Sequence, residues 1–203
     1  MEKSKNLYTV IRIILIPLMK IFFPYTVKGK KNLENCNGAY ILCSNHLSNL
    51  DSVFLVVSNK KQICFMAKSE LFKNFILGYV LKKLGAFSIE RGKGDRKAMS
   101  DAEKILKNGE TLGIFIEGTR SKTGEFLRPH SGTAFLACKV KSPVIPVCIT
   151  GGGKNNKIKL FKKTIISYGK PMNIEDMPGM VDINIGSLRR VSNDIMDKIK
   201  EMR

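Results

Sequence analysis

The chain has 203 residues, enough for one sizeable domain with its own core and too few for two comfortable ones. Hydrophobic residues make up 43% and charged residues 26% of the sequence, and this balance excludes a wholly disordered chain. The 35 lysines and arginines outnumber the 17 aspartates and glutamates, and the net charge of +18 predicts a polyanionic partner such as nucleic acid or an anionic membrane face.

Residues 1–31 contain an apolar run that Arg12, Pro17 and Lys20 interrupt. No uncharged stretch approaches the roughly 20 residues that a membrane-spanning helix needs. A secretory leader needs a small-x-small cleavage site, and none follows, so we expect the segment to stay attached. The lysines within residues 28–31 favour a helix that lies in an anionic membrane interface. A first helix packed on the domain's own core is the alternative that the pattern leaves open.

From residue 39 onward, short apolar runs alternate with helical patterns. The expected strands are residues 39–43, 63–67, 86–89, 111–116, 144–149 and 164–169. The expected helices are residues 52–58, 69–85 (with Ser69 as its cap and Gly85 as its end), 95–107, 131–139 and a basic helix to Arg203. This alternation favours a single α/β domain, residues 32–203, with a mixed or mostly parallel sheet flanked by helices and preceded by the N-terminal helical segment.

The stretch NHLSNLDS, residues 45–52, separates the first strand of the domain from its first helix. It contains His46, with Asp51 five residues behind it. Ser48 followed by Asp51 is typical of a helix N-cap with an acidic first turn, which would give Asp51 a purely structural role. Alternatively, Asp51 accepts a hydrogen bond from one ring nitrogen of His46 and leaves the other nitrogen free to take a proton. The spacing alone does not decide between the two.

A second polar stretch, FIEGTRS at residues 115–121, ends a predicted buried strand. After Glu117, the Gly118-Thr119 pair favours a tight turn with exposed backbone and hydroxyl donors. Arg120 adds a planar fork of donors, and such a loop suits a phosphate monoester. A surface turn with an ion pair is an equally good interpretation.

Arg91 follows another predicted strand and begins a basic cluster with Lys93, Arg96 and Lys97. Because open α/β sheets bind ligands at the carboxyl edge of their strands, we expect this charge near the same edge. A solvated loop is the plainer interpretation of the run.

The five cysteines form no C-x-x-C pair and accompany no histidine cluster. We therefore expect neither a disulfide framework nor a metal site. The basic residues contain no nucleic-acid recognition motif, so we do not expect nucleic acid as the partner.

Four stretches occur in the order NHLSNLD, GAFSIER, FIEGTRS and PVIPV. Together they resemble the four sequence blocks of the glycerolipid acyltransferase family, the enzymes related to 1-acyl-sn-glycerol-3-phosphate acyltransferase. The resemblance extends over residues 39–149, and AKSELF, residues 67–72, resembles the segment that links the first two blocks. The chain departs from the pattern at Ile116, where many members have proline.

The resemblance implies a role for each matching residue. His46 is implied to be the general base, and Asp51 the carboxylate that orients it. The residues implied to bind the acceptor and its phosphate are Lys68, Arg91, Glu117, Gly118, Thr119 and Arg120. The proline-containing block is associated with positioning the acyl part of the substrate.

The resemblance also implies an activity: transfer of a fatty acyl group from acyl-CoA or acyl carrier protein to the free hydroxyl of 1-acyl-sn-glycerol 3-phosphate, giving phosphatidic acid in phospholipid biosynthesis. The acyl thioester is a co-substrate, and we expect no cofactor. The expected partners are a lysophospholipid, the acyl donor and an anionic membrane, with the protein peripheral or monotopic on its cytoplasmic face. Two alternatives stay open. One is an acyltransferase for another lysolipid or for glycerol 3-phosphate, and the other is a non-enzymatic basic module that binds anionic membrane lipid.

Overall fold

The computed structural model describes residues 3–34, 36–89, 96–177 and 184–203. Its strands are β1 (Tyr25–Lys28), β2 (Ile41–Ser44), β3 (Ile63–Lys68), β4 (Phe87–Ile89), β5 (Thr111–Phe115), β6 (Val144–Thr150) and β7 (Thr164–Tyr168). Its helices are α1 (Lys5–Phe22), α2 (Lys31–Glu34), α3 (Asp51–Ser58), α4 (Phe75–Lys83), α5 (Arg96–Lys107), α6 (Gly132–Val140) and α7 (Ile185–Lys200). The 3-10 helices are η1 (Ser69–Phe72), η2 (Lys154–Asn156) and η3 (Ile174–Asp176).

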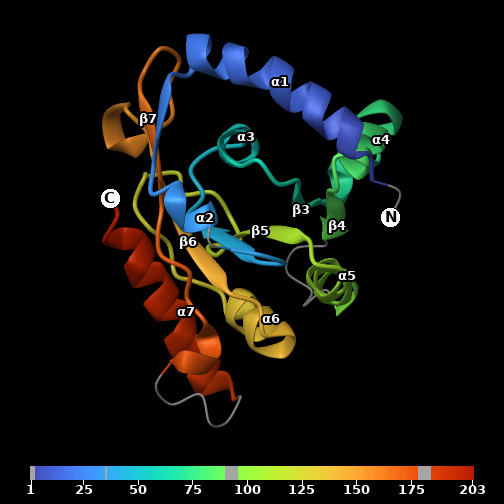
Figure 1. Ribbon diagram of the computed structural model, residues 1–203. Helices are drawn as coiled ribbons and strands as arrows, with labels where there is room; N and C mark the ends of the chain where they lie inside the picture. The colour runs from blue at the N-terminus through green and yellow to red at the C-terminus, as the bar shows by residue number, and fades with distance from the viewer. Residues whose placement is uncertain (1–2, 35, 90–95, 178–183) are drawn as a thin grey trace.

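The described strands form one seven-stranded sheet in the order β1-β7-β6-β2-β5-β3-β4. Strands β4, β3, β5, β2 and β6 pair in parallel, as do β1 and β7, whereas β6 and β7 are antiparallel. Helices cover both faces of the sheet (Figure 1). The predicted α/β fold with a mostly parallel sheet is confirmed.

Two hydrophobic clusters hold the helices on the sheet. The first lies against α5, α6 and α7, and the second lies against α1 and α3. Strand β2 contributes to both, because Ile41 and Cys43 point into the first cluster and Leu42 points into the second. Burial on both faces is usual for a central parallel strand and explains why β2 is apolar without alternation.

Helix α1 lies across the outer side of α3 (Figure 1). Arg12, which interrupts the apolar run, donates from Nε to the carbonyls of Val56 (3.1 Å) and Asn59 (2.8 Å) at the end of α3. A cation is favourable at that helix end, where the last carbonyls lack helical partners. Within the predicted segment 1–31, β1 follows α1 and joins the sheet. No helix of the described ranges is both long and apolar enough to cross a membrane.

The predicted single helix over residues 69–85 is wrong. The chain forms η1 and then α4, and Asn74 caps α4 by accepting a hydrogen bond from Leu77 N (2.9 Å). Gly78 packs on the η1 backbone, where an added Cβ would lie 2.8 Å from Phe72 O, so η1 can fold back onto α4. The apolar stripe of this region faces solvent at Phe75 and Ile76, which are 87% and 75% exposed.

Candidate active site

The two polar stretches meet at the carboxyl edge of the sheet. Strands β2 and β5 are parallel neighbours, with Ser44 opposite Phe115, and His46 and Glu117 each follow two residues later. The backbone N–H of Ser121 donates to the carbonyl of His46 at 2.8 Å, so the loop after β5 runs beside the histidine. Parallel pairing therefore brings together residues that lie about 70 positions apart in the chain.

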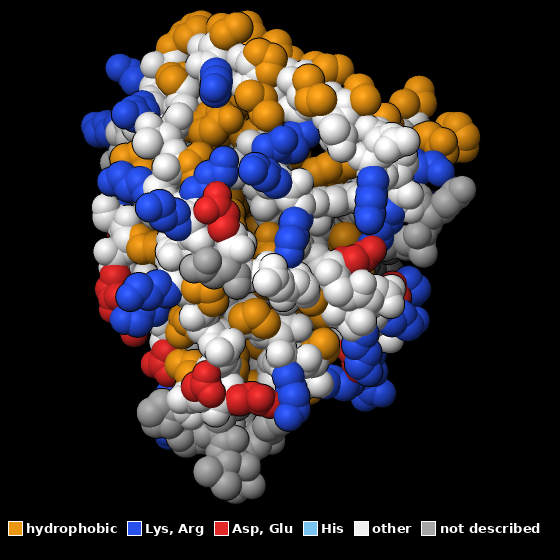
Figure 2. Space-filling model, viewed as in Figure 1, with side chains coloured by type: hydrophobic (Ala, Val, Ile, Leu, Met, Phe, Trp, Pro, Cys, Tyr) orange, Lys and Arg blue, Asp and Glu red, His pale blue; other side chains and the backbone are white. Residues whose placement is uncertain are grey.

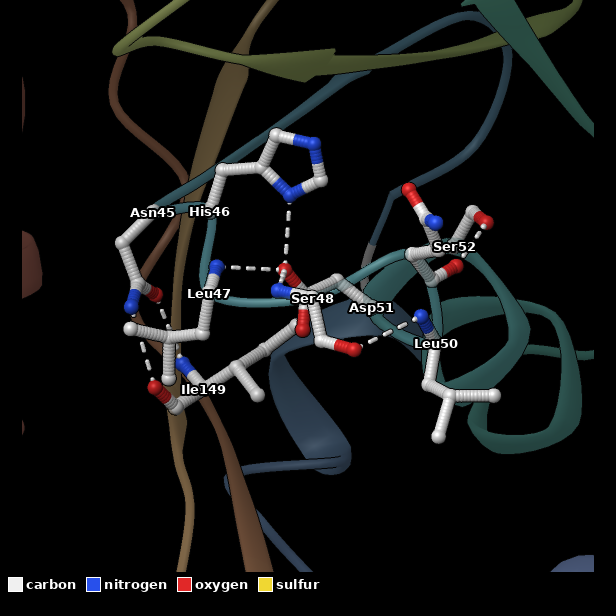
Figure 3. Close-up of polar contacts among 9 residues, drawn as sticks. Asn45, His46, Leu47, Ser48, Leu50, Asp51, Ser52 and Ile149 are labelled. Atoms are coloured by element: carbon white, nitrogen blue, oxygen red, sulfur yellow. Dashed lines mark hydrogen bonds and ion pairs between the residues drawn. The ribbon is translucent and has the colours of Figure 1, made fainter. Parts of the chain in front are cut away.

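The imidazole of His46 is held by Asp51 (Figure 3). Nδ1 of His46 lies 2.7 Å from Oδ2 of Asp51, and the same oxygen accepts hydrogen bonds from the backbone N–H of Leu47 (2.6 Å) and Ser48 (2.8 Å). Both side chains are buried. A carboxylate accepts only, so in the neutral ring Nδ1 carries the hydrogen and Nε2 is left as the acceptor.

Ser48 is not the helix cap that the pattern predicts. Helix α3 begins at Asp51 with Leu50 at the cap position, where there is no side-chain cap hydrogen bond. Ser48 Oγ instead accepts from the backbone N–H of Leu50 at 3.2 Å. The carboxylate of Asp51 accepts from the N–H groups of Leu47 and Ser48, which precede the helix, so it holds the histidine turn and does not cap α3.

Aromatic stacking sets the plane of the imidazole. The ring of His46 lies on that of Phe115, with centroids 3.9 Å apart and planes 9° from parallel. Phe65 stacks next to Phe115, with ring centroids 6.2 Å apart. The second ring nitrogen of His46 points away from Asp51 (Figure 3), and no hydrogen bond from the described part of the chain reaches it. Phe115 went unrecognised in the sequence, where it reads as an ordinary strand residue.

Asn45 is a second site residue that sequence reasoning missed. Its buried amide donates to the carbonyl of Ile149 (3.0 Å) and accepts from the backbone N–H of Ile149 (2.8 Å). This pair of bonds fixes the start of the histidine turn to β6 (Figure 3). Asn45 could have been identified from the sequence, because a buried amide directly after a buried strand must find hydrogen-bond partners inside the protein.

The loop after β5 presents some of its predicted ligands to solvent and buries one. Gly118, Thr119 and Arg120 are exposed, whereas Glu117 is 2% exposed. Burial raises the pKa of the Glu117 carboxyl to about 7, hydrogen bonds from the backbone of His46 and Leu127 oppose that rise, and the nearby Asp51 charge adds to it. The placement favours a positioning role for Glu117 over direct contact with a phosphate.

The raised pKa of Glu117 predicts a pH-dependent effect of Glu117→Gln on stability. Between about 4.5, the ordinary glutamate value, and about 7, the unfolded chain ionises this carboxyl and the folded chain does not, so the wild type loses stability relative to the variant. Above about pH 7 the loss of unfolding free energy by the wild type, relative to the Gln variant, stops growing and amounts to roughly 1 to 3 kcal/mol. Urea unfolding at a series of pH values measures it. A constant difference across the range would contradict the assignment.

His130 is exposed and lies against Gly118 of the same loop. Its backbone N–H donates to the carbonyl of Ile116 at 2.9 Å. A Cβ at Gly118 would lie 2.9 Å from the His130 ring, and Gly118 has a φ of +64°. Only glycine meets both conditions without strain, so Gly118 is required for the turn that precedes Arg120.

Two further predicted contacts are basic. Lys68 ends β3, is exposed, and lies at the carboxyl edge next to β5. Arg91 lies outside the described residues. A cavity of about 330 Å³ is found at the other edge, where β3 and β5 begin, and its lining includes Lys3, Tyr8 and Thr111 but none of the predicted site residues.

Comparison with known proteins identifies the family. The acyltransferase family matches residues 24–150. The 1-acyl-sn-glycerol-3-phosphate acyltransferase of Bacillus subtilis is 33% identical over 151 residues, covering 74% of each chain. The enzyme of the same name from Streptococcus pneumoniae is 27% identical over 209 residues, covering 99% of this chain and 75% of its own.

A solved structure shares the fold. The crystal structure of the 1-acyl-sn-glycerophosphate (LPA) acyltransferase PlsC from Thermotoga maritima superposes with a TM-score of 0.75 at 22% identity, covering 100% of this chain and 83% of that one. The matched stretch of 127 residues includes the His46–Asp51 turn and the loop after β5, and it confirms the resemblance noted in the sequence. This protein is a member of the acyltransferase family.

Proposed function

We propose that the protein transfers a fatty acyl group from an acyl thioester to the free hydroxyl of 1-acyl-sn-glycerol 3-phosphate, giving phosphatidic acid for phospholipid biosynthesis. The observation that carries this proposal is the pairing of His46 with Asp51 beside an exposed loop that contains Arg120. The relatives named as 1-acyl-sn-glycerol-3-phosphate acyltransferases support this choice of acceptor.

In this mechanism Nε2 of His46 takes the proton of the acceptor hydroxyl as its oxygen attacks the thioester carbonyl. The new C–O bond gives a tetrahedral intermediate, which collapses as the C–S bond breaks. The departing sulfur takes the proton from the imidazolium, and the histidine returns to its starting state. Asp51 stabilises the imidazolium between these two transfers. Because a thiolate is a good leaving group, the proposal includes no acyl-enzyme. It also includes no metal and no cofactor.

The exposed part of the loop after β5 is proposed to bind the acceptor phosphate. Arg120 can contact two phosphate oxygens through its planar fork, and Thr119 adds a hydroxyl donor. Lys68 at the end of β3 contributes charge at the same edge, and Arg91 stays part of the proposal from the sequence. Glu117 and Gly118 shape the loop and, in this proposal, do not contact the phosphate.

Arg120→Gln is expected to lower kcat/KM for the phosphorylated acceptor by about 10- to 100-fold, mainly through KM, because a charge-assisted hydrogen bond is lost. Labelled acyl transfer from acyl-CoA to 1-acyl-sn-glycerol 3-phosphate measures this effect. Arg190→Gln removes an exposed arginine on α7, outside the loop after β5, and is the matched control. Transfer only to an acceptor that lacks a phosphate would refute the role of Arg120.

The same assay with other substrates separates the remaining choices. Acyl-CoA and acyl carrier protein share the thioester that reacts, so parallel reactions with each donor identify the source. Glycerol 3-phosphate and other lysophospholipids, offered as acceptors, distinguish the proposed activity from its relatives. We propose that the enzyme works as a peripheral protein on the cytoplasmic face of a membrane. The exposed apolar side chains of α1, which include Val10, Ile13 and Ile21, support this location.

A further inference from the structure

The loop between β6 and β7, residues 151–163, ends in a tip that combines apolar and basic side chains. The tip is residues 157–163, KIKLFKK. Leu160 and Phe161 are 51% and 63% exposed. The four lysines around them are also exposed: Lys157, Lys159, Lys162 and Lys163. Adjacent exposed leucine and phenylalanine are unusual on a surface that faces only water.

The base of the loop is well anchored. Asn156 is 9% exposed, and its Oδ1 accepts from the backbone N–H of Gly151 at 2.8 Å. Ile158, at the start of the tip, packs inward against the second hydrophobic cluster. Gly124 packs on the backbone of Asn155 so closely that a side chain there would collide with it. The loop is thus supported from below while its tip projects.

The tip is also tied to the end of α1. The backbone N–H of Phe161 donates to the carbonyl of Phe22 at 2.7 Å, and their two rings lie 6.1 Å apart. Figure 1 shows this loop, in orange, rising beside the end of α1. In Figure 2, hydrophobic side chains gather along the edge that α1 forms, with lysine or arginine side chains below it and at its end. The tip therefore extends the apolar surface of α1.

Charge distinguishes this region from the opposite side of the molecule. Lysines on α5, α6 and α7 pair with carboxylates, as in Lys107–Glu103, Lys139–Glu103 and Lys200–Asp197. Within the described ranges, no carboxylate lies within ion-pair distance of a tip lysine. Residues 126–174 contain no aspartate or glutamate at all. The positive field at the tip is uncompensated and attracts anions.

Topology places the tip at the reactive edge of the sheet. The loop leaves the carboxyl end of β6, and His46 and Lys68 lie at the carboxyl ends of the parallel strands β2 and β3. A connected path also joins the base of this loop to the site: Ser121 N donates to His46 O, and Ser121 Oγ accepts from Gly124 N at 3.0 Å. Gly124 in turn packs on Asn155.

We propose that the tip, residues 157–163, docks on an anionic lipid bilayer, with Leu160 and Phe161 among the acyl chains and the lysines at the phosphates. This contact goes beyond the proposed reaction, since it requires no acyl transfer. Apolar anchors together with several lysines give the two signals that stable peripheral binding needs. A second copy of the chain is a poor occupant, because two uncompensated lysine clusters would repel each other.

Tryptophan fluorescence tests the insertion directly, because the sequence contains no tryptophan. Phe161→Trp is expected to shift its emission to shorter wavelength, and to be quenched by brominated acyl chains, when vesicles of equimolar phosphatidylcholine and phosphatidylglycerol are added. Ile185→Trp, at a residue that is 71% exposed at the start of α7, is the matched control and should not respond. Equal responses from the two variants, or none from Phe161→Trp while the protein binds the vesicles, would overturn the proposal.

Vesicle cosedimentation tests the energetics. Leu160→Gln with Phe161→Asn is expected to raise the apparent Kd for these vesicles by about tenfold or more, whereas Phe135→Gln with Ile185→Gln changes it by no more than about twofold. Replacing Lys159, Lys162 and Lys163 with Gln is expected to weaken binding by about tenfold or more at low salt, an effect that high salt removes. Removing Lys97, Lys104 and Lys107 from α5 is the matched charge control. The proposal is contradicted if the control substitutions weaken vesicle binding as much as the tip substitutions do, for either the apolar or the lysine set.

Two further measurements separate this proposal from its neighbours. His46→Ala is expected to bind vesicles like the wild type, so docking can hold even if the proposed reaction fails. Sedimentation velocity tests the alternative that the tip joins two copies of the chain. A dimer that the Leu160 and Phe161 substitutions dissociate would overturn the membrane assignment.

Discussion

Replacing His46 with Ala is expected to lower kcat for acyl transfer by roughly a thousandfold. The variant keeps the carboxylate of Asp51 and the loop after β5, but it lacks the imidazole that takes the proton of the acceptor hydroxyl. An unassisted alcohol is a poor nucleophile near neutral pH, so loss of the base falls on the chemical step. Single-turnover transfer of a labelled acyl group from acyl-CoA measures this step without product release.

The matched control for this prediction is His130→Ala. His130 lies against Gly118 and has no proton-transfer role in the proposed mechanism, so its loss should change kcat by no more than about threefold. Circular dichroism and vesicle binding should be unchanged in both variants. If the parent protein transfers no acyl group to any acceptor yet binds anionic vesicles, the non-enzymatic lipid-binding alternative holds instead.

Asp51→Asn is expected to lower kcat by roughly a hundredfold or more while leaving the fold intact. The amide oxygen can occupy the place of Oδ2 and accept from the backbone N–H groups of Leu47 and Ser48. The negative charge is lost, so the imidazolium that forms during the reaction is no longer stabilised. We therefore expect the effect in kcat, with the KM of the acceptor nearly unchanged.

Comparison with Asp51→Ala separates chemistry from structure. Alanine leaves two backbone N–H groups without an acceptor in a buried turn, and this change should cost about 2 to 4 kcal/mol of unfolding free energy. Asparagine should cost much less, as measured by urea unfolding. An asparagine variant with wild-type kcat would show that Asp51 only shapes the turn. Its role would then be purely structural, which is the alternative that the sequence left open.

Local pattern predicted most of the fold. Strands β2 to β7 and helices α3, α5, α6 and α7 overlap the ranges expected from apolar runs, because those elements bury the faces that the pattern marks. The region of η1 and α4 is different. Its apolar residues have a helical spacing, but Phe75 and Ile76 face solvent, and Asn74 starts a new helix within the predicted one. Spacing indicates that a face is apolar and does not say what covers it.

The candidate site was predictable in part for a similar reason. His46 and Asp51 are close in sequence, so a turn can be inferred from their spacing. Phe115 and Asn45 act through strands that pair only in the folded sheet, and no local pattern marks them. Glu117 was predicted to contact substrate, and that contact stays a prediction. Its burial depends on the strand register, which the sequence does not reveal.

The way in which His46 is held limits how the ring can react with any electrophile. One nitrogen faces Asp51 at 2.7 Å, and one face of the ring is covered by Phe115. Alkylating or acylating reagents therefore meet a single nucleophilic atom, and the regiochemistry of labelling is set by the protein and not by the reagent.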